Sequence, residues 1–122
     1  MKFLCMAYEE EEVLNRLTRS EWDALREETL AYVEVLRKSG HLIGTHALKS
    51  ARTAATVRVR DGKLSVLDGP FAETKEQLGR YFLIEARDLD QALQLAASWP
   101  SARIGIIEVR PIQEELPEDC RY

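Results

Sequence analysis

The chain has 122 residues, of which 45% are hydrophobic and 31% are charged. This length and composition predict one globular domain and exclude disordered and collagen-like chains. The formal net charge of −4 argues against a nucleic-acid partner, because such a protein needs a basic face to displace phosphate counterions. No apolar run approaches the roughly 20 residues that a bilayer span requires, so we expect no membrane partner.

The N-terminal segment and the cysteines predict a cytoplasmic protein. The apolar stretch at the start is too short for a signal-peptide core. Cys5 falls in a predicted buried strand and Cys120 in a polar tail, so we expect two reduced thiols and no disulfide. No Cys/His or carboxylate spacing predicts a metal site, and we expect no cofactor.

The first predicted elements are a strand, a loop and a helix. Residues 2–8 are apolar at both odd and even positions, which indicates a strand covered on both sides. The four glutamates at 9–12 predict a solvated loop, since like charges would repel in a core. A helix follows from Thr18 or Ser20 to Ser39, where Thr18 and Glu21 form a capping-box pattern and Gly40 ends the helix.

A β-hairpin is the clearest local prediction. Residues 41–48 form a second strand, and residues 56–66 then alternate around Asp61-Gly62, which favours a two-residue type I′ turn. That register pairs Arg58 with Ser65 on one face. It places four apolar residues on the other: Val57, Val59, Leu64 and Val66.

The second half of the chain repeats the pattern of strand, helix and strand. We expect a helical turn at 74–77, a strand at 80–86, a helix capped by Asp88 and ended by Pro100, and a strand at 104–109. Residues 1–112 would form the domain. Residues 113–122 would form an acidic, flexible tail.

This order predicts an α+β, ferredoxin-like split βαβ sandwich with an added hairpin. Two helices can cover only one face of the sheet, although several strands are apolar on both. We therefore expect a homodimer in which the sheets pair face to face. The alternative is a monomer whose hairpin and tail fold over the sheet.

The segment from Val66 to Gly79, with Asp68-Gly69-Pro70-Phe71 at its centre, resembles the signature of the DGPF branch of the YCII-related proteins. The resemblance extends over nearly the whole chain and implies a bacterial, cytoplasmic domain of the dimeric α+β barrel type. It implies little about chemistry: most members have no assigned reaction, and a few relatives act on ring compounds through a His-Asp pair. Arg80 departs from the second glycine that is common in the family, which either narrows the approach to a pocket or matters little.

Asp68 is the first candidate for a functional carboxylate. An Asp in such a turn normally accepts a hydrogen bond from the N–H two residues on, but that residue is Pro70, which has none. Asp68 must therefore bond elsewhere, for example to the Phe71 N–H, or keep its carboxylate free. A turn-capping role and a functional role are both open, and the resemblance favours function.

His46 and Tyr81 are the candidates to assist Asp68. His46 is a possible proton carrier because its ordinary pKa lies close to neutrality, although a half-buried histidine bonded to backbone explains it as well. A ligand would contact the rest of the motif, where Lys75 would steady an anion: Gly69, Pro70, Phe71, Glu73 and Lys75. The alternative is that the charges form the solvated side of a turn.

Two functions follow. The first is a cofactor-independent lyase or isomerase that acts on an unknown small molecule at an Asp68-centred site on the dimer edge. The second is a non-catalytic dimer that binds a metabolite or a partner protein. The resemblance associates DGPF proteins with sigma factors, which leaves a role in transcription regulation open.

Overall fold

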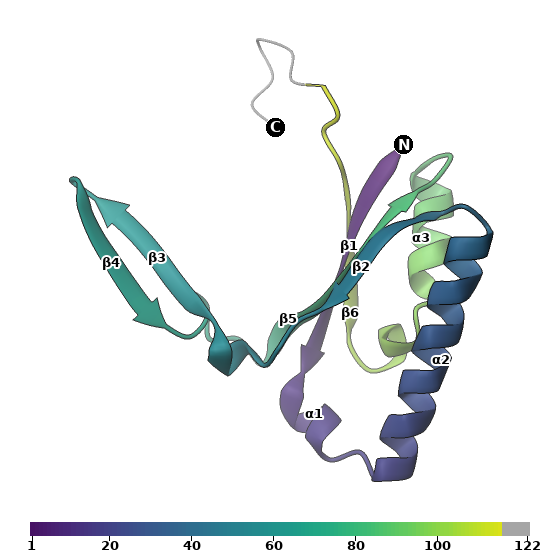
Figure 1. The fold of residues 1–122 in the computed structure, drawn as a ribbon, viewed down its shortest axis with the longest axis horizontal. Coiled ribbons are helices and arrows are strands. Elements are labelled where there is room, and N and C mark those ends of the chain that lie inside the picture. Colours follow the sequence, from purple (N-terminus) through teal and green to yellow (C-terminus); the bar gives the residue numbers. More distant parts are fainter. Residues whose placement is uncertain (116–122) are drawn as a thin grey trace.

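The structure is a computed structural model, and residues 1–115 are the part of the chain that it describes. Figure 1 shows two layers, a twisted sheet with helices on one side, and a hairpin that stands apart. The strands are β1 (Lys2–Glu10), β2 (Leu42–Ala47), β3 (Ala55–Arg60), β4 (Lys63–Asp68), β5 (Glu76–Glu85) and β6 (Ile106–Pro111). The helices are α1 (Glu11–Asn15), α2 (Arg19–Lys38) and α3 (Leu89–Ala97), with 3₁₀ turns η1 (Ala51–Thr53) and η2 (Pro100–Arg103).

The main sheet has the strand order β2-β5-β1-β6, and its neighbouring strands are antiparallel. Both long helices, α2 and α3, lie on the same face (Figure 1). Each βαβ unit is split by the strand between its two ends, as in a ferredoxin-like fold. The predicted α+β class is therefore confirmed.

The hydrophobic core lies between this sheet and the helices. In β1 and β5 the buried residues alternate, so Phe3 faces Ile84 and Cys5 faces Phe82 across the ladder. Trp99, which precedes η2, closes the core, and its ring stacks on Phe82 at a centroid distance of 4.1 Å. Burial raises the pKa of the Cys5 thiol to about 12, so this thiol stays neutral.

Local sequence signals fixed the helix ends. Thr18 and Glu21 form the predicted reciprocal capping box of α2, and Gly40 follows the helix with a φ of 79°. Asp88 caps α3 by accepting a hydrogen bond from the Gln91 N–H at 2.8 Å. These predictions are confirmed.

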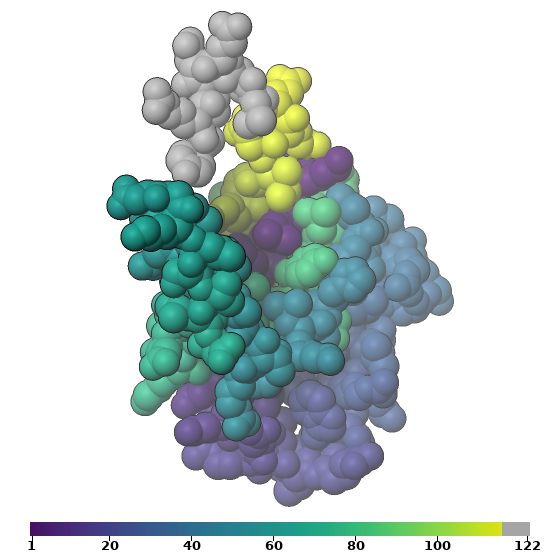
Figure 2. Space-filling view, turned by 60° about the vertical axis from the view of Figure 1, so that its left-hand side comes forward, coloured from purple at the N-terminus to yellow at the C-terminus, as the bar shows by residue number. Residues whose placement is uncertain are grey.

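The hairpin β3–β4 has the predicted register. Asp61 and Gly62 both have positive φ, as a type I′ turn requires, and Arg58 faces Ser65. The hairpin extends away from the main sheet (Figure 1). Its four apolar side chains on one face are each more than half exposed: Val57, Val59, Leu64 and Val66. In the space-filling view it stands in front of a recess in which β1 is visible (Figure 2).

Two predicted segments were wrong. Residues 9–12 do not form a loop, because β1 continues through Glu10 and α1 begins at Glu11. Residues 74–77 do not form a helical turn, because β5 already starts at Glu76, which pairs with Glu10 of β1. In both places the long β1–β5 ladder outweighed the local pattern.

The strand bounds and the C-terminal segment differ from the expectations in smaller ways. The last strand runs two residues later than predicted, because a 3₁₀ turn ends at Arg103. Residues 113–115 are exposed, whereas the rest of the predicted tail, with Cys120, lies outside the described residues. Within residues 1–115, no helix has the length and apolar character needed to cross a membrane.

The sheet face opposite the helices carries a mixed, partly apolar surface. By register, Met6 of β1 lies between Tyr81 of β5 and Glu108 of β6 on this face. Further residues of the same parity on it are Leu4, Tyr8, His46, Leu83 and Ile106. We call this surface the open face, because no helix of the described chain covers it (Figure 1).

Candidate small-molecule site

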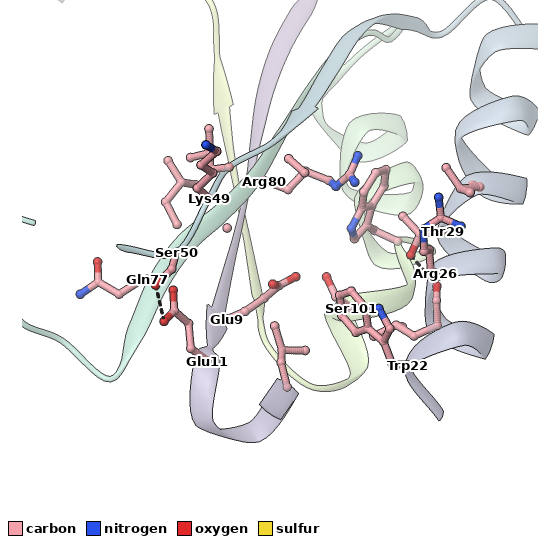
Figure 3. A pocket seen from close by; sticks show the side chains of 18 residues that line it. Glu9, Glu11, Trp22, Arg26, Thr29, Lys49, Ser50, Gln77, Arg80 and Ser101 are labelled. Atoms are coloured by element: carbon pink, nitrogen blue, oxygen red, sulfur yellow. Dashed lines mark hydrogen bonds between the residues drawn. The ribbon is translucent and has the colours of Figure 1, made fainter. Parts of the chain in front are cut away.

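A cavity of about 490 Å³ opens on the helix side of the sheet, beside the N-terminal half of α2. Its walls come from the ends of β1 and β5, from α2, from η2 and from residues 47–50 (Figure 3). This volume lies within the range of small-molecule sites, roughly 300–1,000 Å³. Here it is called the helix-side cavity.

Glu9 places a carboxyl group inside this cavity. It has the same parity in β1 as the buried Cys5 and Ala7, so its side chain points to the helix side and towards Ser101 (Figure 3). Two glycines leave the room that the side chain needs. A Cβ on Gly79 would lie 2.8 Å from Glu9 Oε2, and a Cβ on Gly105 would lie 3.5 Å from Glu9 Cγ.

The surroundings of Glu9 favour its protonated form. Burial raises the pKa of the Glu9 carboxyl above its ordinary value, although the Ser101 hydroxyl and the charge of Arg80 lower it in part. Glu9 and Arg80 attract each other but form no ion pair. A carboxyl group in such surroundings can act as a proton donor or acceptor.

Arg80 contributes a cation from the opposite wall (Figure 3). It pairs with Ala7 in the ladder and shares the inward parity of Phe82. Its guanidinium carbon lies 5.7 Å from the centroid of the Trp99 ring, and Nη1 donates a long hydrogen bond of 3.4 Å to Thr45 Oγ1. Burial lowers the pKa of Arg80, which nevertheless stays charged.

Ser101 adds a buried hydroxyl group beside Glu9. It is 5% exposed, and its Oγ makes no well-formed hydrogen bond within residues 1–115, although it lies close enough to the Glu9 carboxyl to lower the pKa of that group. A buried hydroxyl in this state costs free energy unless a ligand or water bonds it. The turn that carries Ser101 is fixed to α2 by a double hydrogen bond from Arg103 to Glu28, at 2.6 and 2.7 Å.

One rim of the cavity is held by Glu11. Its carboxylate accepts hydrogen bonds from the Ser50 hydroxyl at 2.9 Å and from the Ala51 N–H at 2.8 Å. These bonds lower the pKa of Glu11, the backbone bond most strongly. They tie the segment between β2 and the hairpin to the start of α1, so the rim is defined by specific contacts.

The helix-side cavity thus combines a carboxyl group, a guanidinium and a buried hydroxyl with apolar walls. Such a set can orient a polar ligand and move one proton on it. The acid or base would be Glu9, and Arg80 would stabilise negative charge on the ligand. Among residues 1–115, no group of three or more His, Cys, Asp and Glu side chains is arranged to hold a metal ion.

Asp68 lies elsewhere. It is exposed at the end of β4, where it pairs with Ala55, and it does not line the helix-side cavity. Gly69, which follows Asp68, has a positive φ of 94°, a backbone conformation that glycine adopts readily. Two hydrogen bonds to the backbone of Gly69 hold this turn. The Gly69 N–H donates to the Ala54 carbonyl oxygen at 2.6 Å, and the Thr56 hydroxyl donates to the Gly69 carbonyl oxygen at 2.8 Å.

The other motif residues divide into two groups. Pro70, Glu73 and Lys75 line a separate cavity of about 690 Å³, together with Arg52 and the glutamates at 10–12. Phe71 projects into solvent and is 86% exposed. None of the predicted ligand-binding residues therefore lines the helix-side cavity. Gly69 directly follows β4 and precedes the others in the chain.

His46 and Tyr81 do lie together, with their ring centroids 5.7 Å apart. They pair across β2 and β5 on the open face, which is the opposite side of the sheet from Glu9 and Arg80. These two predicted residues thus form a pair of their own.

Sequence reasoning missed Glu9 and Ser101 and gave Arg80 no role in binding. A signal existed for two of them. Extending the inward parity of Cys5 and Ala7 by two residues reaches Glu9, and extending that of Phe82 back by two reaches Arg80. Ser101 gave no such signal, since its burial depends on the docking of η2.

Comparison with known proteins identifies the family. The YCII-related domain matches residues 1–115, the whole of the described chain. The chain belongs to the YCII-related family. An uncharacterized protein of Rhizobium meliloti (strain 1021) is 34% identical over 114 residues, which cover 92% of each chain. Membership confirms the resemblance at the level of the YCII-related family, while assignment to the DGPF branch stays a prediction. The chemistry of the helix-side cavity has to be argued from its residues.

Proposed function

We propose that this YCII-related chain binds a small organic molecule in the helix-side cavity and acts on it as a cofactor-independent lyase or isomerase. The observation that carries the proposal is the half-buried Glu9 carboxyl, which shares the cavity with the Arg80 guanidinium and the buried Ser101 hydroxyl. Perturbed carboxyl groups in cavities are concentrated at functional sites.

The proposed chemistry is a proton transfer. A glutamate whose pKa is raised above its ordinary value is a stronger proton acceptor when ionised and can return the proton afterwards, as an isomerase or lyase requires. Negative charge that develops on the substrate would be stabilised by Arg80, and Ser101 would orient a polar atom. The shielded walls strengthen both interactions, because few waters compete for them.

We also propose that the chain forms a homodimer through the open face and the hairpin. A two-stranded hairpin is marginally stable by itself, and this one exposes its whole apolar face. The open face offers a second apolar surface of the same chain, so a two-fold contact would cover both. In such a dimer, Asp68 and Phe71 would lie near the partner's sheet, which keeps the Asp68-centred site at the dimer edge as a hypothesis.

A second candidate function is a non-catalytic binding module. It is favoured by the exposed hairpin and by Phe71, whose large apolar side chain contributes to no core within residues 1–115. Exposed apolar patches of this kind mark interaction surfaces. Under this alternative the cavity would bind a metabolite that modulates a partner protein.

The deciding experiment compares three variants. Compounds that bind are first found through tryptophan fluorescence and then followed by NMR for conversion. We expect Glu9→Gln to retain binding and lose turnover, Asp68→Asn to leave both unchanged, and Glu12→Gln to behave as the wild type. Glu12 is the matched control, because it belongs to the same glutamate run but does not line the helix-side cavity.

The opposite results have clear meanings. Loss of turnover in Asp68→Asn with an intact Glu9→Gln would move the active site to the DGPF motif. Binding without conversion of any bound compound would favour the non-catalytic module. Absence of binding would remove the helix-side cavity from consideration.

A further inference from the structure

Arg80 is a half-buried cation that makes no close ion pair within residues 1–115, although the Glu9 carboxyl attracts it from across the cavity. No carboxylate of residues 1–115 forms an ion pair with it, although seven such pairs involve other residues. Those pairs lie on the surface, whereas Arg80 lines the helix-side cavity. Removing a guanidinium from water without pairing it is unfavourable. Binding of an anion beside Arg80 would offset this cost and is therefore favourable.

The guanidinium is also held in place before any ligand arrives. Its position over the Trp99 ring, at 5.7 Å, fixes one side, and its single hydrogen bond to Thr45 is long, at 3.4 Å. Thr45 Oγ1 itself donates to Tyr81 O at 2.8 Å. Most of the five N–H donors of Arg80 therefore have no partner among the described residues, and their planar fork matches the two oxygens of a carboxylate.

The remaining walls indicate what the anion is attached to. Most of the apolar lining comes from α1, α2 and the neighbouring strand ends: Leu14, Trp22, Leu25, Leu30, Leu48 and Leu78. The Glu11 carboxylate on the rim is already occupied by Ser50 and Ala51. Glu9 faces Arg80 across the cavity, so a second negative charge on a ligand would meet this carboxyl group.

We propose that the helix-side cavity selects small monocarboxylic acids with an apolar body, and that Arg80 is the residue that sets this specificity. The ligand carboxylate forms a forked pair with the guanidinium. Its apolar body lies against Trp22 and the leucines, and its polar substituent reaches Glu9 and Ser101. The inference rests on the proposed function, since it names the substrate class for the same cavity.

The chain carries its own reporter for the test. It contains two tryptophans, Trp22 and Trp99, and both line the helix-side cavity. Quenching or enhancement of tryptophan fluorescence therefore reports on this cavity. The probes are benzoate, phenylacetate and 3-phenylpropanoate, each compared at neutral pH with its uncharged amide of nearly the same shape.

We expect each carboxylate to bind the wild type at least about tenfold more tightly than its amide, because a charged hydrogen bond is lost with the amide. Arg80→Leu should abolish this preference, and Arg80→Lys should keep part of it, since lysine retains the charge but not the fork. Arg16→Leu is the matched control. It removes the same charge from an exposed position outside the helix-side cavity and outside the cavity lined by Pro70, Glu73 and Lys75, and it should leave the preference unchanged.

Thermal unfolding of each variant shows whether it is folded, and Arg80→Lys preserves the test if Arg80→Leu does not fold. Equal binding of carboxylates and amides by the wild type would overturn the inference while the proposed binding function stands. An unchanged preference in both Arg80 variants would also overturn it. If neither carboxylates nor amides bind, the inference and the proposed function fall together.

Discussion

The helix-side cavity and the hairpin deviate from ordinary burial in opposite directions. In the cavity, polar groups are withdrawn from water with few partners: within residues 1–115, the Ser101 hydroxyl is 5% exposed and makes no well-formed hydrogen bond, and Arg80 makes no close ion pair. On the hairpin, apolar groups remain in water, with Val57 and Leu64 64% and 68% exposed. Each arrangement costs free energy in the isolated chain.

The difference indicates what each region lacks. Unpartnered polar groups around a hollow of ligand size are satisfied by a small polar molecule. An extended apolar strand surface has no hollow and is satisfied by another protein surface, of which a second copy is the simplest. We therefore propose that one domain carries a ligand site on the helix side of its sheet and an association surface on the hairpin and the open face.

The largest expected effect is on stability, and it contrasts a buried residue of the cavity wall with an exposed residue of the motif around Asp68. Trp99→Ala removes a buried ring that stacks on Phe82, and it should lower the free energy of unfolding by about 3–5 kcal/mol. Phe71→Ala should change the stability of the monomer by less than about 0.5 kcal/mol, because this ring is exposed. Urea denaturation at low protein concentration measures both, and similar losses would contradict the comparison.

The two glycines beside Glu9 give the next effect. A Cβ on Gly105 would lie 2.4 Å from the Tyr8 carbonyl oxygen, which is backbone, so Gly105→Ala should cost about 1–3 kcal/mol of stability. A Cβ on Gly79 would instead meet the end of the Glu9 side chain, which can move. Gly79→Ala should therefore leave the stability nearly unchanged but weaken ligand binding. Equal melting temperatures for the two variants would contradict this account.

The hairpin prediction concerns assembly. Val57→Thr combined with Val66→Thr keeps the size and β-propensity of a facing pair and makes it polar. We expect the dimer dissociation constant to rise by about tenfold or more, measured by sedimentation velocity, because apolar area would be lost from the interface. Arg58→Thr on the opposite face is the control. A wild type that sediments as a monomer at high concentration would refute the dimer itself.

The smallest expected effect is a pH dependence at Glu9. Its pKa in the folded chain is above the ordinary value of 4.5, so the folded state binds more protons than the unfolded state as pH rises past 4.5. Stability is therefore lost over that window and stays lower at neutral pH. Burial raises the pKa of Glu9 and outweighs the Ser101 hydroxyl and the charge of Arg80, which lower it. The other charged groups that line the cavity are Glu11, Arg26 and Lys49.

Glu9→Gln should consequently melt a few degrees higher than the wild type at pH 7, and the difference should vanish near pH 4, where both side chains are neutral. Differential scanning calorimetry at several pH values measures it. Glu12→Gln, which lies outside the helix-side cavity, should show no such gain. A Glu9→Gln variant that is less stable at pH 7 would mean that attraction to Arg80 outweighs burial.

The sequence by itself determined the parts whose causes lie within a few residues. The Asp61-Gly62 turn set the hairpin register, and Thr18 with Glu21 set the start of α2. The order of strands and helices was enough to indicate the ferredoxin-like fold, since few topologies suit it. The motif around Asp68 was enough to indicate the family.

Only the tertiary structure assembled the helix-side cavity. Glu9, Arg80 and Ser101 lie far apart in the chain and meet because β1 pairs with β5 and η2 docks against α2. A run of four glutamates indicates solvent by composition, but strand pairing carries the first of them inward. Local propensity extends over a few residues, whereas burial is decided by contacts across the whole fold, and burial is what gives Glu9 and Arg80 their unusual surroundings.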